Sequence, residues 1–339
     1  MDTEFWKEQR VLVTGATGLV GSWLVKDLLA HGANVTALVR DWNPQAEFIR
    51  NDIYRQCTIV CGALEDCFAV ERAIVENEIS IVIHLAAQAI VSVAERSPLQ
   101  TFEANIRGSY NIMDACRQHK GLVKALVVAS SDKAYGSSAV LPYLEDHALV
   151  GVRPYEVSKT CTDLLAQSYF QSYGVPVAIG RCGNIYGGGD LNWSRIVPGT
   201  IRSIMRAERP ILRSDGKFIR DYIYVRDVSS AYMRMAEAVC KQQANALGQA
   251  FNFSPEKPFT VLEIVSEIQN ALNRHDLEPV ILNQAQSEIR DQYLDASKAL
   301  RVLNWKANYS ISEGMAETVK WYADFLGAEL NTKHPIKTI

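Results

Sequence analysis

The sequence has few features of a membrane, secreted or nucleic-acid-binding protein. No apolar run is long enough to cross a membrane, and the first residues lack the basic and then apolar profile of a signal peptide, so we expect a cytoplasmic protein with no membrane partner. The 35 Lys and Arg residues are balanced by 38 Asp and Glu residues, which argues against nucleic acid as a partner. The seven cysteines have neither the paired spacing nor the neighbouring histidines of a zinc site, so we predict no metal and expect reduced, mostly buried thiols.

The chain is long and apolar enough for a large core. With 339 residues, of which 48% are hydrophobic, it can bury one such core and a second, smaller lobe. Short apolar strands alternate with helical patterns along the first half, which predicts an α/β fold with a Rossmann-type, doubly wound parallel sheet. We expect a dinucleotide-binding domain at 1–184 with returning segments at about 219–254, a smaller C-terminal α/β substrate lobe at 185–218 and 255–330, and a frayed tail at 331–339.

A glycine-rich turn follows the first predicted strand, Arg10–Thr14. Gly15, Gly18 and Gly21 recur at spacings of three just before a helical pattern. Such glycines let the backbone turn tightly and approach a pyrophosphate, while the helix N-terminus faces the anion. Three glycines could also merely form a strand–helix turn, but the strand before them and the helix after them favour a dinucleotide site.

The second predicted strand, Asn34–Val39, is followed by Arg40 and Asp41. An acidic residue at this point binds the ribose hydroxyls of NAD, whereas an arginine accommodates the extra phosphate of NADP. Asp41 therefore favours NAD, and Arg40 keeps NADP open.

The strand predicted at 81–84 contains His84 and runs into Ala86 and Ala87, whose small side chains allow a cofactor to approach closely. A histidine here could be taken for a catalytic base. Because His84 lies in an apolar strand, we expect a hydrogen-bonded structural residue instead. The next helix is expected at 99–119, before a strand at 123–129.

That strand ends in a cluster of chemically active side chains. Ser131, Asp132 and Lys133 follow it, and Tyr155 and Lys159 come at the start of an amphipathic helix. A spacing of four puts the phenol and the ammonium on one helix face, where the cation would lower the pKa of the phenol toward neutrality and make it a general base. The alternative is a surface tyrosine followed by a solvated lysine, but the nucleotide-binding start and the strand that ends in serine favour catalysis.

Arginines are frequent between residues 195 and 220. A solvated basic face would account for most of them, but Arg195 and Arg220 interrupt apolar patterns, where an unpaired guanidinium would be costly. Because arginine binds phosphate through parallel hydrogen bonds, we expect a buried diphosphate as the partner.

Several motifs, taken together and in this order, resemble an extended short-chain dehydrogenase/reductase that acts on nucleotide sugars. The resemblance covers roughly residues 9 to 325. Ser131-Asp132-Lys133 stands where the 4,6-dehydratases of this family carry a hydroxyl residue and two acid/base groups, and Asp-Lys is similar to the CDP-glucose 4,6-dehydratases. The motifs are Gly15-x-x-Gly18-x-x-Gly21, His84-Leu85-Ala86-Ala87, Asn105-Ile106-x-Gly108-Ser109, Tyr155-x-x-x-Lys159, Arg181-x-Gly183-Asn184 and Arg220-Asp221-x-x-x-Val225.

Two segments depart from the CDP-glucose pattern. Where that group has Arg-Pro-Trp-Gln-His, this chain has residues 220–224 in the form common to enzymes of other nucleotide sugars, so a UDP-, dTDP- or GDP-sugar stays open. Gly62-Ala63 stands where the superfamily has Gly-Asp, and Ala63 lacks the carboxylate that contacts the adenine.

The resemblance implies an NDP-hexose 4,6-dehydratase that forms a 4-keto-6-deoxy nucleotide sugar by internal hydride transfer and loss of water. It implies that Tyr155, aided by Ser131 and Lys159, serves the hydride step, that a neutral Lys133 is the base at carbon 5, and that Asp132 is the acid for the 6-hydroxyl. A 4-epimerase that needs only Ser131, Tyr155 and Lys159 is the alternative enzyme. A non-catalytic dinucleotide sensor is the alternative outside enzymes.

The resemblance also implies the binding residues and a homodimer or homotetramer. For the cofactor these are Gly15, Thr17, Gly18, Leu19, Val20, Gly21, Arg40, Asp41, Ala63, Leu64, Leu85, Ala86, Ala87, Asn105, Tyr155 and Lys159. For the nucleotide sugar they are Gln88, Asn184, Arg195, Arg220 and Asn252.

Overall fold

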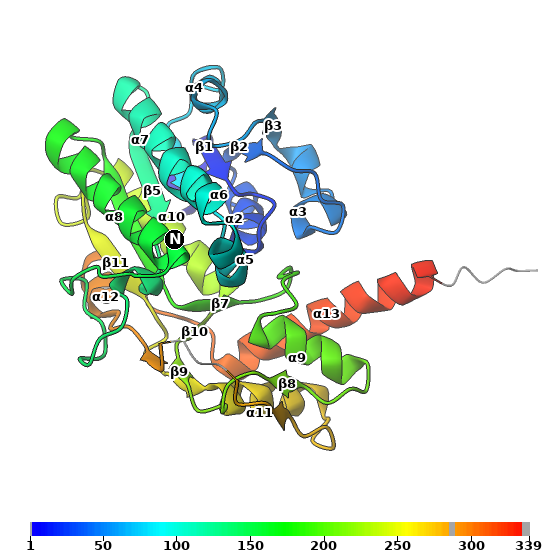
Figure 1. The fold of residues 1–339 in the computed structure, drawn as a ribbon. Helices are drawn as coiled ribbons and strands as arrows, with labels where there is room; N and C mark the ends of the chain where they lie inside the picture. The colour runs from blue at the N-terminus through cyan, green and yellow to red at the C-terminus, as the bar shows by residue number, and fades with distance from the viewer. Residues whose placement is uncertain (1, 285–288, 334–339) are drawn as a thin grey trace, which may run out of the picture.

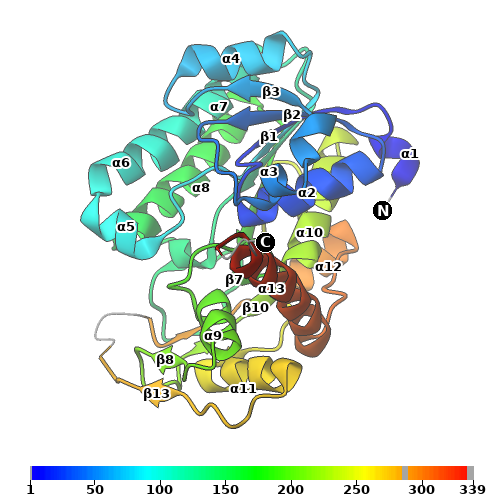
Figure 2. The same cartoon turned by 90° about the vertical axis from the view of Figure 1, so that its right-hand side faces the viewer.

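A seven-stranded parallel sheet organises the larger part of the protein, as the sequence predicts (Figures 1 and 2). The computed structural model describes residues 2–284 and 289–333. The strand order β3-β2-β1-β4-β5-β6-β11 reverses direction between β1 and β4, and a parallel sheet binds its ligand at such a point, outside the carboxyl ends of the strands. The strands are β1 (Arg10–Thr14), β2 (Asn34–Val39), β3 (Thr58–Cys61), β4 (Ile81–His84), β5 (Ala125–Ala129), β6 (Val177–Cys182) and β11 (Ala250–Phe253).

Helices cover both faces of the sheet, and alternate side chains of each strand enter separate cores. Val11 and Val13 of β1 pack with α2 (Leu19–Ala30) and α10 (Val225–Cys240) on one face. Leu12 packs on the other face, which is covered by α4 (Cys67–Val75), α7 (Gly108–Gln118) and α8 (Pro154–Tyr173). Successive side chains of a strand point to opposite faces, and both faces are covered by helices. The strands are therefore apolar almost throughout.

The helix predicted at 99–119 is present at 98–118, but its winding changes in the interior. It begins with α6 (Pro98–Phe102), which follows the short helix α5 (Val91–Arg96), and a π-turn at Glu103–Arg107 (η2) joins α6 to α7. The main-chain carbonyl of Asn105 accepts hydrogen bonds from the hydroxyls of Ser109 and Thr162. These two hydroxyls stabilise the widened helical turn. As a result the Asn105 side chain points into the protein interior.

Within the described residues, the smaller lobe is built from three helices and short strands. Its helices α9 (Ile196–Met205), α11 (Val261–Leu272) and α13 (Ile311–Lys333) share a core that includes Ile201, Ile264 and Tyr322. The short strands are β7 (Asn184–Tyr186), β8 (Ile211–Leu212), β9 (Ile219–Arg220), β10 (Tyr222–Tyr224), β12 (Phe259–Thr260), β13 (Val280–Ile281) and β14 (Asp291–Gln292).

The division into two domains stays a prediction, and one predicted lobe segment lies elsewhere. Helix α12 (Ser297–Leu303) packs against β11, and Trp305 stacks edge-on against Phe253 of the sheet. The predicted tail falls at the end of α13 and beyond it, and its residues 334–339 lie outside the described part of the chain.

The cysteine prediction holds in part. All seven are free thiols, but Cys116 and Cys182 alone are buried, and Cys61 and Cys67 are exposed. Cys61 ends the edge strand β3, and Cys67 is the first residue of α4, so neither reaches the core. None of the helices in the described part of the chain combines the length and the apolar character needed to cross a bilayer.

Candidate functional site

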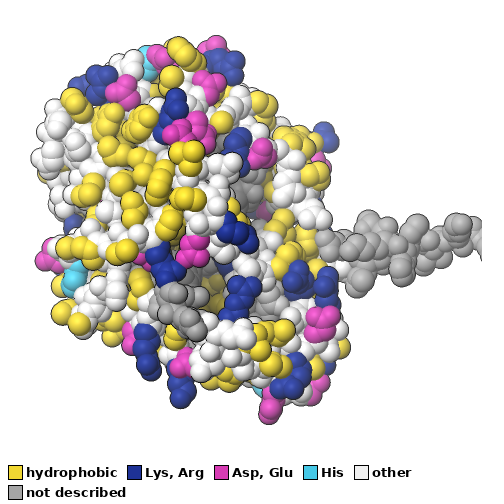
Figure 3. Space-filling view, in the orientation of Figure 1, with side chains coloured by type: hydrophobic (Ala, Val, Ile, Leu, Met, Phe, Trp, Pro, Cys, Tyr) yellow, Lys and Arg dark blue, Asp and Glu magenta, His cyan; other side chains and the backbone are white. Residues whose placement is uncertain are grey.

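A cleft of about 1140 Å³ lies between the carboxyl ends of the strands and the smaller lobe. Figure 3 shows Lys and Arg side chains around this hollow. Its wall includes the turn after β1, the ends of β2, β4 and β5, the start of α8, and residues from α9 and β9. The sheet's switch point is therefore the floor of the cleft.

The turn between β1 and α2 forms a cradle that side chains would fill. Gly15 has φ +75, and a Cβ on it would lie 2.8 Å from the main-chain nitrogen of Ala86. A Cβ on Gly21 would lie 2.0 Å from the carbonyl oxygen of Gly15. Gly18 caps α2 without a side-chain hydrogen bond, so the amides of the first helical turn face the cleft. The arrangement fits the pyrophosphate of a dinucleotide, and Thr17, Leu19 and Val20 line it as well.

Arg40 and Asp41 lie at the far end of the cradle, where a ribose would be bound. They form an ion pair with each other at 2.7 Å, and both side chains are largely exposed. Leu64 lines the cleft nearby, but Ala63 is not part of its wall. The contact of Ala63 with the cofactor stays a prediction.

His84 is a structural residue, as the sequence predicts. Its Nδ1 lies 2.8 Å from Oγ1 of Thr14, and its Nε2 lies 3.0 Å from Oγ of Ser109. Burial, together with the charge of Lys159, lowers the pKa of His84 to about 3, so the ring is neutral at physiological pH. Both ring nitrogens are engaged, and His84 does not line the cleft.

Tyr155, Lys159 and Ser131 all line the cleft. Nζ of Lys159 donates to the carbonyl oxygen of Ala129 at 2.7 Å, and burial lowers the pKa of Lys159 to about 8. The expected depression of the pKa of Tyr155 is not observed, because burial raises it. The groups that act in the lowering direction are the Ser131 hydroxyl and the charge of Arg195.

Asp132 and Lys133 lie beside this set on the 3-10 turn η3 (Asp132–Tyr135), which the Ser131 hydroxyl caps by accepting from the Lys133 amide. Nζ of Lys133 is 3.9 Å from Oδ2 of Asp132. The Asp132 side chain is only 4% exposed, which excludes a solvated surface ion pair. The amine of Lys133 also donates to Oε1 of Gln292, a residue of the smaller lobe.

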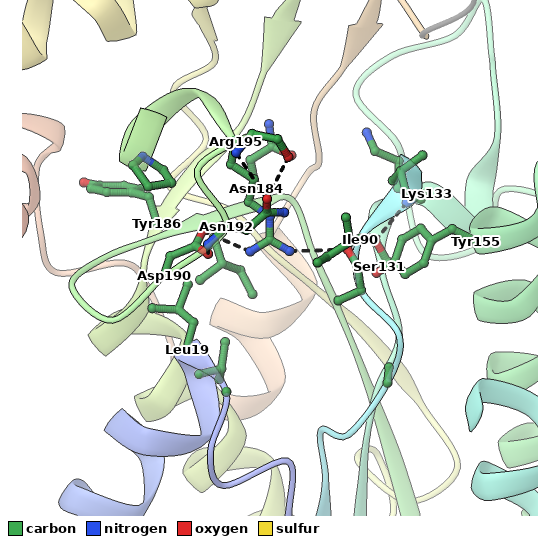
Figure 4. A pocket seen from close by; sticks show the side chains of 18 of the residues that line it. Leu19, Ile90, Ser131, Lys133, Tyr155, Asn184, Tyr186, Asp190, Asn192 and Arg195 are labelled. Carbon is green, nitrogen blue, oxygen red and sulfur yellow. Dashed lines mark hydrogen bonds and ion pairs between the residues drawn. The ribbon is translucent and has the colours of Figure 1, made fainter. Parts of the chain in front are cut away.

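The two predicted phosphate-binding arginines have protein partners. Arg195 bonds to Oδ2 of Asp190 at 3.0 Å and to the carbonyl oxygen of Ala89 at 3.3 Å, and in Figure 4 it reaches across the cleft toward Ile90. Arg220 is buried and donates to the carbonyl oxygens of Ile219 and Arg290 at 2.8 and 2.6 Å. A diphosphate is therefore not required to pair Arg220, although both arginines line the cleft.

Asn105 and Gln88, predicted to bind cofactor and substrate, instead hold each other behind the wall. Oδ1 of Asn105 accepts a hydrogen bond from the main-chain N–H of Gln88 at 2.7 Å, and Nδ2 of Asn105 donates to the main-chain carbonyl of Gln88 at 3.1 Å. Neither residue lines the cleft. Together they fix the loop after β4, whose Ala86 and Ala87 do line it.

Asn252, also predicted to bind substrate, is fully buried away from the cleft wall. It accepts from the Tyr135 hydroxyl at 2.7 Å and donates to the Tyr143 carbonyl at 3.0 Å. Its amide braces the segment that follows η3. Asn184, by contrast, lines the cleft as expected.

The sequence reasoning missed three residues that define the site. Asp190 follows a run of glycines, a signal that could have marked it, and it positions Arg195. Trp193 lines the lobe side of the cleft. Gln292 carried no local signal, because its partner Lys133 is 159 residues away in the chain.

Comparison with known proteins identifies related chains over almost the full length. Residues 11–252 match the family described as the NAD dependent epimerase/dehydratase family. The chain is 29% identical to CDP-glucose 4,6-dehydratase of Salmonella typhimurium, over 97% of this chain and 94% of that protein. It is 27% identical to a putative UDP-glucose 4-epimerase of Methanocaldococcus jannaschii, over 92% and 97% of the two chains.

Solved structures with the same fold include both kinds of enzyme. A UDP-glucose 4-epimerase from Stenotrophomonas maltophila with bound NAD superposes with a TM-score of 0.86 at 25% identity, over 95% of this chain and 100% of that one. A dTDP-glucose 4,6-dehydratase from Streptomyces venezuelae with NAD has a TM-score of 0.83 at 23% identity, over 94% and 98%. The second likeness concerns the fold alone.

Proposed function

Because the chain belongs to the NAD-dependent epimerase/dehydratase family, we propose that it is a nucleotide-sugar 4,6-dehydratase. The observation that carries the proposal is the buried Asp132 carboxyl and the Lys133 amine on one turn beside Ser131 and Tyr155. Proton transfers at carbon 5 and at the 6-hydroxyl need such a pair, whereas oxidation at carbon 4 does not. The product is a nucleotide-linked 4-keto-6-deoxy sugar.

In the first step Tyr155 takes the proton of the 4-hydroxyl. When bound, NAD supplies the redox chemistry by accepting a hydride from carbon 4 and returning it at carbon 6. The phenolate of Tyr155 is stabilised by the Ser131 hydroxyl and by the positive charge of Arg195, which offset part of the effect of burial. The Lys159 amine donates a hydrogen bond to the Ala129 carbonyl and thereby fixes the start of α8, which carries Tyr155, to the end of β5.

In the second step the new ketone acidifies the proton on carbon 5, and the neutral amine of Lys133 removes it. Asp132 donates its proton to the departing 6-hydroxyl, which leaves as water. A proton returned to carbon 5 and a hydride to carbon 6 complete a reaction without net oxidation.

For the nucleotide sugar we propose the lobe side of the cleft. Arg195 is the candidate for the diphosphate, because its side chain is partly exposed and it lines the cleft. CDP-glucose is the first substrate to test, on the likeness to the Salmonella enzyme. UDP-, dTDP- and GDP-glucose are the alternatives, since residues 220–224 have the form found with other nucleotide sugars.

A 4-epimerase is the second candidate. It is favoured by UDP-glucose 4-epimerases among the similar folds, such as the one from Thermotoga maritima with a TM-score of 0.84 at 26% identity. It would use Ser131, Tyr155 and Lys159 alone and leave Asp132 and Lys133 without a chemical task.

We also propose a homodimer or homotetramer that forms through α7 and α8. Tyr110, Leu164 and Tyr173 on these helices are exposed, and Figure 3 shows hydrophobic side chains gathered over this part of the surface. Analytical ultracentrifugation of the purified protein tests this, and a monomer at all concentrations would contradict it. The cytoplasmic location stays a prediction.

The direct test of the function is incubation of purified protein with each of the four nucleotide glucoses. We expect one of them to lose the mass of one water and to give a 4-keto product. A product of unchanged mass that proves to be the 4-epimer would establish the second candidate instead.

A further inference from the structure

A glutamine of the smaller lobe lies beneath the acid/base pair. Gln292, in β14, is fully buried. Its Oε1 accepts a hydrogen bond from Nζ of Lys133, and its Nε2 donates to the main-chain carbonyl of Asp132 at 2.9 Å. One amide therefore holds both the turn η3 and the amine that it carries.

Gln292 is itself held firmly. Strand β14 pairs in parallel with β9, with Gln292 in register with Arg220, whose guanidinium bonds to main-chain carbonyls just before β14. After β14, the amide of Leu294 donates to Oδ2 of Asp221 at 2.7 Å. The strand is thus fixed on both sides of Gln292, so the lobe sets the position of the Lys133 amine.

The amide group has a chemical advantage over a carboxylate in this place. An amine that donates one hydrogen to an amide oxygen keeps its lone pair free for a substrate proton. A carboxylate would stabilise the charged ammonium form, which has no lone pair. Gln292 therefore orients the amine without adding a second carboxylate to that of Asp132, whose Oδ2 lies 3.9 Å from Nζ of Lys133.

We propose that Gln292 is a positioning residue for the elimination of water, which aims Lys133 at carbon 5 of the sugar and adds no charge to the site. The inference rests on the proposed function for its chemistry, but the contact itself can be tested without any substrate. It makes the smaller lobe a structural part of the elimination step.

Other charged or titratable groups face this end of the cleft and set the background for any titration of Lys133. They include Asp132 on the same turn, Tyr155, Glu156 and Lys159 on α8, Arg195 before α9 and Arg220 of β9. Asp221, which follows β9, does not line the cleft, but burial, together with the nearby charge of Asp132, raises the pKa of Asp221. The variants below leave all of these in place.

The first test measures the amine directly. Competitive acetylation at a series of pH values, read by mass spectrometry, follows the neutral fraction of Lys133, with the exposed Lys320 as internal reference. In Gln292→Glu we expect the labelling curve of Lys133 to move to higher pH by roughly one to three units, because an opposite charge now lies at the amine. An unchanged curve overturns the inference.

The second test separates the two chemical steps in Gln292→Met. Reduction of bound nicotinamide by the nucleotide sugar should continue, while formation of the dehydrated product falls about 100-fold, the loss expected when a reacting group is misplaced by about 1 Å. Gln269→Leu is the matched control, since Gln269 is a buried glutamine of α11 that bonds to the Leu277 carbonyl. Equal loss in both steps would show a merely structural role and overturn the inference.

The two tests also distinguish failure of the inference from failure of the proposed function. A shifted labelling curve without dehydration of any sugar keeps the contact with Lys133 and removes the dehydratase. Normal dehydration by both Gln292 variants keeps the dehydratase and removes the positioning role. Should Gln292→Met fail to fold, the Gln292→Glu curve still decides.

Discussion

Two neighbouring parts of the site are anchored in different ways. Tyr155 and Lys159 lie on α8, and the Lys159 amine is fixed by the carbonyl at the end of β5, so the hydrogen bond that anchors this pair lies within the sheet half. Asp132 and Lys133 lie on η3 and are held by Gln292 from the smaller lobe. The hydride apparatus is therefore anchored locally, whereas the elimination apparatus depends on a contact between the two halves of the protein.

The strongest way to break this comparison is to remove the elimination base. Lys133→Met should lower product formation by roughly two to four orders of magnitude, the usual contribution of a positioned acid/base group, while the hydride step continues. Reduced nicotinamide should accumulate and appear as new dihydronicotinamide absorbance. Asp132→Asn is the companion variant, and unchanged elimination in both would remove the role of the pair.

Removing the base of the hydride step should stop the reaction before the nicotinamide is reduced. Tyr155→Phe should lower turnover by roughly 100-fold or more, and no reduced nicotinamide should accumulate, because the first proton has no acceptor. Bound cofactor and thermal unfolding, measured in parallel, should match the parent protein. Near-normal turnover would exclude Tyr155 as the base.

The burial of the Lys159 amine can be tested through the pH dependence of protein stability. Burial lowers its pKa from 10.5 to about 8, so between these values the unfolded chain binds a proton that the native chain lacks, and stability rises with pH. The slope is at most about 1.4 kcal/mol per pH unit. Lys159→Met removes the buried charge. The free energy of unfolding of this variant should therefore exceed that of the parent protein most below pH 8, and the excess should shrink toward pH 10.5. Denaturant titrations of both proteins at a series of pH values measure this difference, and a difference that stays constant with pH would contradict the buried amine.

The smallest effect is expected far from both parts, at the ribose end of the cradle. Asp41→Ala should release bound NAD roughly tenfold faster, the value of one charge-assisted hydrogen bond. Cofactor freed by denaturation of the parent should be NAD. Recovery of NADP alone would assign this end of the cleft to Arg40.

The same contrast explains how far the sequence could be followed. The glycine turn, the alternation of apolar strands with helices and the Tyr155/Lys159 spacing were predictable because each depends on residues close together in the chain. The π-turn at Asn105 was not, because it is stabilised by Ser109 and by Thr162 from another helix.

Long-range polar contacts account for the remaining corrections. Arg220 finds its partners at the carbonyls before β14, 70 residues away along the chain, so the diphosphate predicted for it was not needed. Asn252 meets Tyr135 and Tyr143 behind the site, more than 100 residues from either. No local pattern in the sequence predicts such long-range hydrogen bonds.

The most direct test of the central claim, that the Asp132–Lys133 pair eliminates water after the hydride step, is an isotope measurement on the parent protein. A nucleotide glucose deuterated at carbon 4 is converted in ordinary water, and its undeuterated form is converted in deuterium oxide. The account predicts that the carbon 4 label moves to carbon 6 and that carbon 5 takes its hydrogen from the solvent. A product that keeps its original hydrogen at carbon 5 and its oxygen at carbon 6 would contradict the account.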